Sequence, residues 1–223
     1  DETVGQVITY DDEIVCAYFF STSGGRTEAP ENVWYSSVPY LKAVDDEYEI
    51  EVDNSTTWKA TYTMSEISSK VGGIGTIKDI EILERSENDR VTKLKITGNK
   101  GYKILEKNNI RSILGSTRIR SQWFDVEIDG NDVVFTGRGN GHGIGMSQNG
   151  AIGMALNGFD YEKILNWYYT DIEILGIDSN NSKDDDKYPE QHIEIEEDEV
   201  KNRPLLVKLT SICSKNWLVD SIM

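Results

Sequence analysis

The amino-acid sequence predicts an α+β fold of antiparallel β-hairpins with a few short helices, ending in a Gly-rich loop followed by two helices. Short apolar runs are separated by acidic or Asn/Gly turns, which is typical of hairpins. Helical patterns with capping residues are few and short. No strand–helix–strand alternation and no internal repeat occurs. The length of 223 residues suggests one domain, or one domain with a tail.

The first part of the chain favours strands. Residues 5–10 and 14–20 are apolar runs that flank the acidic turn 11–13, so they predict a hairpin. Residues 58–63 predict another strand. A short capped helix is expected at residues 65–71.

The second part predicts two more hairpins, and the turn Asp129-Gly130-Asn131 is a strong signal for one of them. Their strands are expected at residues 77–83, 91–97, 124–128 and 133–137. Helices are expected at residues 107–114, 147–158 and 160–170, with Gly158 and Asp160 as candidate caps.

Charge divides the chain into a predicted domain, residues 1–176, and an acidic linker with an unassigned tail, residues 177–223. Residues 178–201 hold 10 acidic and 3 basic residues. The whole chain carries a net charge of −16. That charge argues against nucleic acid or an anionic membrane surface as a partner, since both require basic surfaces.

Cysteine and histidine are scarce. The chain has Cys16 and Cys213, His142 and His192, and no CxxC or HExxH motif. The sequence therefore predicts no metal site and no cofactor. Cys16 is expected to be a small buried strand residue. A disulfide with Cys213 has no support in the sequence.

The densest motif is the signature segment, residues 137–151, in which five glycines alternate from Gly137 to Gly145. This spacing permits positive φ angles and close approach of other atoms. A dinucleotide-binding reading lacks the strand–helix–strand unit and the acidic residue it needs, and no Gly-Lys-Ser/Thr follows for a P-loop. A packing loop that holds His142 by hydrogen bonds is the plain alternative.

The signature segment matches Gly-x-Gly-x-Gly-His-Gly-x-Gly-Met-Ser-Gln-x-Gly-Ala position by position. This pattern resembles that of the stage II sporulation protein D (SpoIID)/LytB family. A second stretch, residues 18–28, and the pair Ser121 and Phe124 also resemble the family. The resemblance covers roughly residues 3–174.

The resemblance implies a lytic transglycosylase of peptidoglycan that acts on glycan strands lacking stem peptides during engulfment in sporulation. It implies a partner amidase, membrane-anchored sporulation proteins and an extracytoplasmic location, with any anchor or signal upstream of these residues. LytB-type members enhance an amidase.

The family's catalytic Glu is on a helix resembling Glu-Ala-Leu-Lys-Ala-Gln-Ala-Val-Ala-Ala-Arg-Thr, and these 223 residues contain no such stretch. No catalytic residue is therefore assigned. Glu28, Glu31 and Glu162 lie near the motifs and are expected to be solvated rather than substitute acids.

The motifs are then interpreted as parts of a substrate groove. Hydroxyls and backbone N–H groups hold sugars, and Arg26 would meet the muramoyl lactyl carboxylate. Each role has an alternative: a self-bonded turn for residues 21–25, a surface ion pair for Arg26, and a loop-locking role or, more weakly, a metal for His142. The candidate substrate-binding residues are Ser21, Thr22, Ser23, Gly24, Gly25, Arg26, His142, Met146, Ser147 and Gln148.

Three readings of function remain open at this point. The first is a SpoIID-type lytic transglycosylase represented by part of its chain. The second is a non-catalytic module that binds glycan or enhances an amidase. The third is an inactive truncated product, which only the unusual tail supports.

Overall fold

The computed structural model describes residue 3, residues 5–51 and residues 56–176. These residues form two compact units, one of residues 18–170 and one from the segments on either side of them. Residues 177–223, with the predicted linker and tail, Cys213 and His192, lie outside the described residues.

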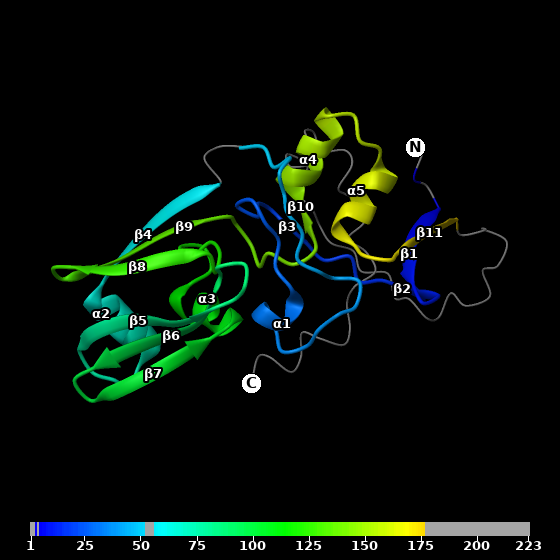
Figure 1. Cartoon of the computed structure of the whole chain (residues 1–223). Coiled ribbons are helices and arrows are strands. Elements are labelled where there is room, and N and C mark those ends of the chain that lie inside the picture. The colour runs from blue at the N-terminus through cyan, green and yellow to red at the C-terminus, as the bar shows by residue number, and fades with distance from the viewer. Residues whose placement is uncertain (1–2, 4, 52–55, 177–223) are drawn as a thin grey trace. The chain divides into compact units, whose positions relative to one another are not determined.

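The smaller unit is a three-stranded antiparallel sheet in the order β11-β1-β2 (Figure 1). Its strands are β1 (Gln6–Tyr10), β2 (Glu13–Ile14) and β11 (Glu173–Gly176). Asp11 and Asp12 make the turn with positive φ angles, which Asp tolerates better than most residues. The predicted hairpin therefore exists, but its second strand ends at Ile14 rather than at residue 20.

The predicted strand role of Cys16 is wrong. Cys16 is half-buried and follows β2 outside any strand. Its apolar neighbours Val15 and Phe20 are buried, but they belong to different parts of the structure, since Phe20 lies in a separate strand.

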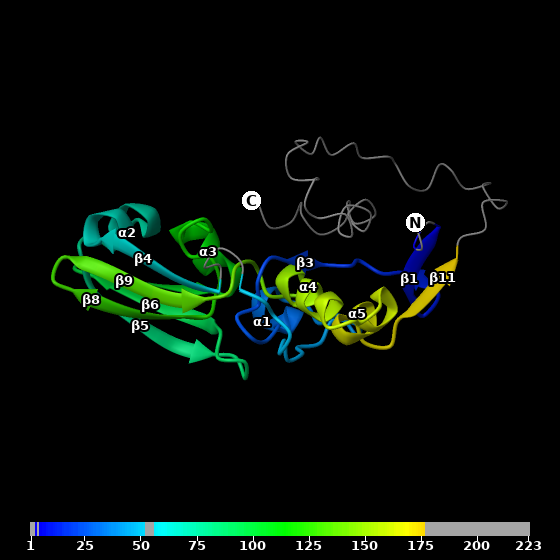
Figure 2. The same cartoon turned by 90° about the horizontal axis from the view of Figure 1, so that it is seen from above.

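Most of the larger unit is a lobe, residues 57–138, with two antiparallel three-stranded sheets (Figure 2). One has the order β4-β9-β8 and the other β5-β6-β7. Helices α2 and α3 pack against these strands. The bounds are β4 (Thr57–Thr63), α2 (Met64–Val71), β5 (Ile77–Arg85), β6 (Val91–Gly98), β7 (Gly101–Glu106), α3 (Asn108–Leu114), β8 (Phe124–Asp129) and β9 (Asp132–Arg138).

Alternation of apolar residues explains why the lobe folds this way. In β4 every second residue is buried, Trp58, Ala60 and Tyr62, so one face points into the core. In α2, Thr63 and Glu66 form a capping box that fixes the start of the helix, while Ile67 and Val71 enter the core.

The rest of the larger unit carries short elements: β3 (Phe19–Phe20), α1 (Pro30–Val33), β10 (Met146–Ser147), α4 (Gln148–Leu156) and α5 (Tyr161–Tyr168). The strands β3 and β10 pair in parallel. Residues 139–145 connect β9 to β10.

The structure confirms a mixed α and β chain with mostly antiparallel sheets and few helices. The two predicted hairpins of the lobe are present, as β5–β6 and β8–β9. The sequence analysis did not predict α1, β7, β10 or β11. No helix among the described residues is long and apolar enough to cross a membrane.

Candidate functional site

The candidate site is where the signature segment, residues 137–151, meets the serine-glycine segment, residues 21–26. In the β3–β10 pair, Phe19 lies opposite Met146. Thr22 and Asn140 then exchange two backbone hydrogen bonds of 3.0 and 2.7 Å. The Asn149 amide also donates to the Thr22 hydroxyl at 3.0 Å, across 127 residues of sequence. The β3–β10 pair, the Thr22–Asn140 bridge and the Asn149–Thr22 hydrogen bond therefore bring the two segments together.

Close approach explains two of the alternating glycines. Gly145 has a φ of +74°, and a Cβ there would lie 2.1 Å from the carbonyl oxygen of Tyr18. Gly139 has a φ of +78°, and its Cβ would lie 2.7 Å from the carbonyl oxygen of Ser23. A side chain at either position would push the two segments apart, so glycine is required at both.

His142 is locked inside the signature segment. Its Nδ1 accepts a hydrogen bond from the N–H of Ile144 at 3.0 Å, so this nitrogen carries no proton. The imidazole lies among aromatic rings, with centroids 5.5 Å from Phe20, 5.5 Å from Trp34 and 6.3 Å from Tyr18. This geometry supports the loop-locking interpretation.

Burial lowers the pKa of His142 from its ordinary 6.5 to about 4, helped by the positive charges of Arg111 and Arg90 and opposed by a hydrogen bond with the Phe19 backbone. The imidazole is therefore neutral at physiological pH. Within the described part of the chain, no group of three or more His, Cys, Asp or Glu side chains is placed to hold a metal ion.

Glu49 joins the two segments by its side chain. Its carboxylate accepts hydrogen bonds from the backbone N–H groups of Ser23 and Gly24, the latter at 3.0 Å, and from the Ser147 hydroxyl at 3.1 Å. Burial raises the pKa of Glu49, and the charge of Asp46 raises it further, while the hydrogen bonds from Ser23 and Gly24 oppose the shift. Glu49 is thus a partly buried carboxyl group at the centre of the site.

Helix α5 positions the segment that carries Glu49. The Tyr168 hydroxyl donates to Asp46 Oδ1 at 2.5 Å, and the Trp167 indole donates to the Asp45 carbonyl at 2.9 Å. Asp46 is buried and donates its own N–H to the Gly25 carbonyl at 3.0 Å. The segment that precedes Glu49 is therefore held by α5 and by Gly25.

Sequence analysis missed Glu49. It follows the run Asp45-Asp46-Glu47, which has the composition of a solvated acidic turn. No periodicity or spacing distinguishes it from its neighbours, and only the long-range pairing of β3 with β10 brings Ser147 to it. No signal in the single sequence could have found this residue.

Four of the predicted substrate-binding side chains point inward. Thr22, Ser23, Met146 and Ser147 are buried. The Ser23 hydroxyl accepts the Gly25 N–H at 2.9 Å, and Ser147 caps α4 by accepting the Gly150 N–H at 3.2 Å. Hydroxyls engaged in this way brace the two segments against each other. Gly24 is buried as well.

The other predicted residues reach the surface. Ser21, Arg26, His142 and Gln148 are partly exposed and Gly25 is exposed. Arg26 is also engaged: it forms an ion pair with Asp45, and its Nε donates to Asn88 Oδ1 at 2.6 Å. This is the surface ion pair that the sequence analysis left open for Arg26. Binding of a substrate by any of these residues stays a prediction.

The expectation that Glu28 is solvated is wrong. Glu28 is completely buried, and its carboxylate accepts hydrogen bonds from Ser86, Asn88 and Asn32 side chains and from the Ala29 N–H. The sequence neighbourhood supplies only Ala29 and Asn32, since Ser86 and Asn88 come from the turn between β5 and β6. Glu31 and Glu162 are exposed, as expected.

Arg90 supports the same region from the lobe. It is 1% exposed, and its guanidinium donates to the carbonyl oxygens of Ser23 and Arg26 at 2.9 and 3.0 Å. Burial lowers the pKa of Arg90 to about 10, so the side chain stays charged at neutral pH. A Cβ on Gly143 would lie 2.9 Å from this guanidinium, which gives a third glycine of the loop a packing role.

Comparisons with known proteins find relatives over most of the chain. A family model described as a domain of unknown function (DUF8618) matches residues 46–145. The chain is 36% identical to stage II sporulation protein D of Bacillus amyloliquefaciens over 187 residues, covering 81% of this chain and 51% of the relative. It is 35% identical to the protein of that name from Bacillus subtilis, covering 79% of this chain and 50% of the relative.

A third relative is the amidase enhancer of Bacillus subtilis, 27% identical over 218 residues, covering 76% of this chain and 31% of the relative. The chain thus spans about half the length of the stage II sporulation proteins D it matches. Matches to both kinds of protein, together with the joined motifs described above, show that the chain belongs to the SpoIID/LytB family.

Proposed function

We propose that this chain is part of a peptidoglycan lytic transglycosylase of the SpoIID type, acting outside the cytoplasm in sporulation on glycan strands that lack stem peptides. The observation that carries the proposal is the join between the two family motifs by β3–β10, the Thr22–Asn140 bridge and Glu49. The names of two relatives support the link to sporulation.

The reaction needs few groups. A carboxylic acid protonates the oxygen of the leaving N-acetylglucosamine as the bond from that oxygen to the anomeric carbon of N-acetylmuramic acid breaks. The 6-hydroxyl of the same N-acetylmuramic acid then bonds to the anomeric carbon, and its proton returns to the carboxylate. The product carries a 1,6-anhydro ring, and no water is consumed.

The burial pattern separates the predicted residues into buried ones that brace the segments and partly exposed ones that can meet a ligand. The buried Thr22, Ser23 and Ser147 fix the two segments, while Ser21 and Gln148 place a hydroxyl and an amide near the surface, where a sugar chain can reach them. Arg26 would meet the lactyl carboxylate after exchanging its exposed partner Asp45 for it, which the weakness of exposed ion pairs permits.

Product analysis tests the proposal. The chain is incubated with glycan strands lacking stem peptides, and mass spectrometry looks for 1,6-anhydromuramoyl ends. The family's catalytic stretch has no match in these 223 residues, so we expect the strands to be bound but not cleaved, and to be cleaved once that stretch is supplied upstream. Strands that neither bind to this chain nor are cleaved by the extended one contradict the proposal.

A variant decides the role of Glu49 in the same assay. Anhydro ends formed by the chain alone would mean that one of its own carboxyls is the acid. Their loss in Glu49→Gln, with retention in Glu47→Gln, would identify Glu49, whose raised pKa suits proton donation.

The second candidate function is a non-catalytic module that binds glycan or enhances a partner amidase. The match to an amidase enhancer favours it. Addition of the chain to an amidase acting on intact peptidoglycan distinguishes the two: faster release of stem peptides with no anhydro ends, even from the extended chain, supports the enhancer.

A further inference from the structure

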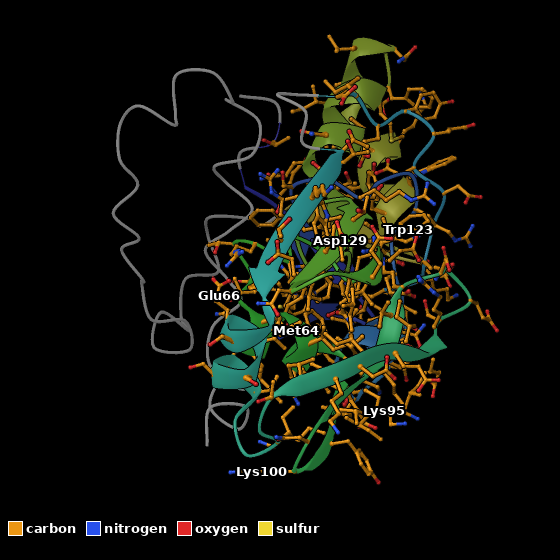
Figure 3. The ribbon with its side chains drawn as sticks, turned by 90° about the vertical axis from the view of Figure 1, so that its left-hand side faces the viewer. Met64, Glu66, Lys95, Lys100, Trp123 and Asp129 are labelled. Atoms are coloured by element: carbon orange, nitrogen blue, oxygen red, sulfur yellow. The ribbon has the colours of Figure 1, made fainter. Side chains whose placement is uncertain are left out.

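A cleft of about 770 Å³ opens in the lobe, and none of its lining residues belongs to either family motif. Its walls come from the start of α2, the glycine-rich turn after it, the β6–β7 turn and the β8–β9 turn. In Figure 3, Met64 lies at the α2 wall and Lys100 at the β6–β7 turn.

The walls of this cleft are held by hydrogen bonds before any ligand arrives. The Lys100 N–H donates to the Ile74 carbonyl at 3.0 Å, and the Asn99 side chain accepts the Thr76 N–H at 3.1 Å. On the other side, the Met64 N–H donates to the Asn131 carbonyl at 3.1 Å. A preformed site loses less entropy when it binds a ligand.

Most of the residues that line the cleft are polar, and Lys100 is the only charged residue among them. Three serines, a threonine, Asn99 and Asn131 take part and no Asp or Glu does, and the Ser68 hydroxyl already donates to the Gly75 carbonyl. The nearest acid on α2, Glu66, already pairs with Arg118 at 3.0 Å. Such a lining suits a ligand with many hydroxyl and amide groups and a negative charge.

The charge of the surrounding lobe points the same way. The lobe, residues 57–138, holds 14 Lys or Arg and 11 Asp or Glu, a net charge of +3, whereas the whole chain has a net charge of −16. Its basic residues gather in residues 90–120, which hold nine Lys or Arg and one Asp or Glu. This stretch contains β6, β7 and α3 and supplies Lys100 itself. An anionic polymer repelled by the rest of the molecule would be attracted to this lobe.

We infer that the cleft is a second glycan-binding site, which holds a carboxylate-bearing glycan strand through Lys100 and its hydroxyl and amide lining. The ligand class rests on the proposed function, because glycan strands lacking stem peptides carry a free lactyl carboxylate on each N-acetylmuramic acid. The strand would then contact the molecule at the cleft as well as at the two motifs.

The test compares the full chain with Lys100→Glu and with Lys78→Glu, a matched reversal at an exposed lysine of β5 that does not line the cleft. Binding to soluble glycan oligomers lacking stem peptides is measured by calorimetry at low salt. We expect Lys100→Glu to weaken binding by about fivefold or more, and Lys78→Glu by less than about twofold. Ser69→Trp, at an exposed position of the cleft, should weaken binding without changing the melting temperature.

Two further ligands sharpen the result. Uncharged chitin oligomers should bind more weakly and be insensitive to Lys100→Glu. Equal binding of carboxylated glycan by Lys100→Glu, Lys78→Glu and the unchanged chain overturns the inference. The inference is also overturned if Lys100→Glu weakens the binding of a poly(glycerol phosphate) more than it weakens the binding of the glycan. If Lys100 controls glycan binding while the extended chain forms no anhydro ends, the proposed enzyme fails and the binding site stands.

Discussion

At the scale of single residues, the carboxylate of Glu49 joins the two segments of the candidate site. Glu49 accepts two backbone N–H groups and one hydroxyl from segments far apart in sequence. A buried donor that loses such an acceptor costs more free energy than a typical hydrogen bond contributes. Its structural role can therefore be measured separately from any catalytic one.

Replacement of Glu49 by Ala leaves the N–H groups of Ser23 and Gly24 and the Ser147 hydroxyl without their acceptor. We expect the free energy of unfolding to fall by about 1–3 kcal/mol in urea denaturation. The control is Glu47→Ala, an exposed acid two residues earlier, which should change stability by less than about 0.5 kcal/mol. Equal effects of the two variants would show that Glu49 does not brace the site.

His142 predicts a dependence of stability on pH. Its folded pKa of about 4 lies below the unfolded value near 6.5, so the unfolded chain binds the proton more readily between these values. The stabilisation from the neutral ring is complete above pH 6.5 and is lost as the pH falls towards 4, with an upper bound of roughly 3 kcal/mol.

The measurement is the pH dependence of the unfolding free energy for the chain and for His142→Asn, which has no titrating ring. The difference between the two should shrink steadily from pH 6.5 to pH 4. Parallel curves over this range would contradict the lowered pKa of His142.

Residue types near the motifs were easier to predict than their environment. The sequence offered a loop-locking role for His142 and an ion pair for Arg26, and the structure contains the contacts for both. It misjudged Glu28, because the partners Ser86 and Asn88 are supplied by a turn 58 to 60 residues later. Burial of a polar side chain by a distant segment leaves no local trace.

At the scale of elements, the short parallel pair β3–β10 is the connection on which the site depends. It has two residues in each strand, so its stability comes from the close contact that Gly145 permits rather than from a long ladder. This makes the pair sensitive to a single methyl group.

Gly145→Ala should disrupt the pair, since the new Cβ would lie 2.1 Å from the Tyr18 carbonyl oxygen. Gly158→Ala is the matched control, because its φ of +83° is similar and no atom lies within 4 Å of its Cβ position. The control should cost only the backbone strain of about 1–2 kcal/mol. Thermal unfolding should show a distinctly larger loss for Gly145→Ala, and similar losses would argue against the close approach.

Elements with local signals were predicted and those without were not. The β8–β9 hairpin carries its own turn, with Gly130 at a φ of +61°. Helices α2 and α5 each begin after a capping residue, Thr63 and Asp160. By contrast, Phe19–Phe20 lies within one continuous apolar run of the sequence. Only its pairing with the distant β10 makes it a strand separate from β2.

At the scale of the whole molecule, the chain enters and leaves the lobe at one point. The Gly139 N–H donates to the Thr56 carbonyl at 2.7 Å, so the two ends of the lobe are in contact. The core cluster built by Trp58, Tyr62, Leu94 and Phe135 lies entirely between these ends. A chain segment whose two ends meet and which has its own core has the properties of an inserted domain.

A fragment of residues 56–139 should therefore fold alone. We expect a β-rich circular dichroism spectrum and a single cooperative transition in urea. A fragment without a cooperative transition would mean that the lobe needs the serine-glycine segment, whose Ser23 and Arg26 carbonyls hold Arg90.

The contact between Thr22 and Asn149 also has a consequence for synthesis of the protein. The two residues are 127 positions apart, and at about 5–20 residues per second a ribosome needs roughly 6–25 s to add the second after the first. During that interval the lobe can complete its own hairpins, while β3 still lacks its partner. The nascent chain thus exposes the apolar strand Phe19–Phe20 until almost the last described helix has emerged, and this is the stage at which a chaperone would have something to hold.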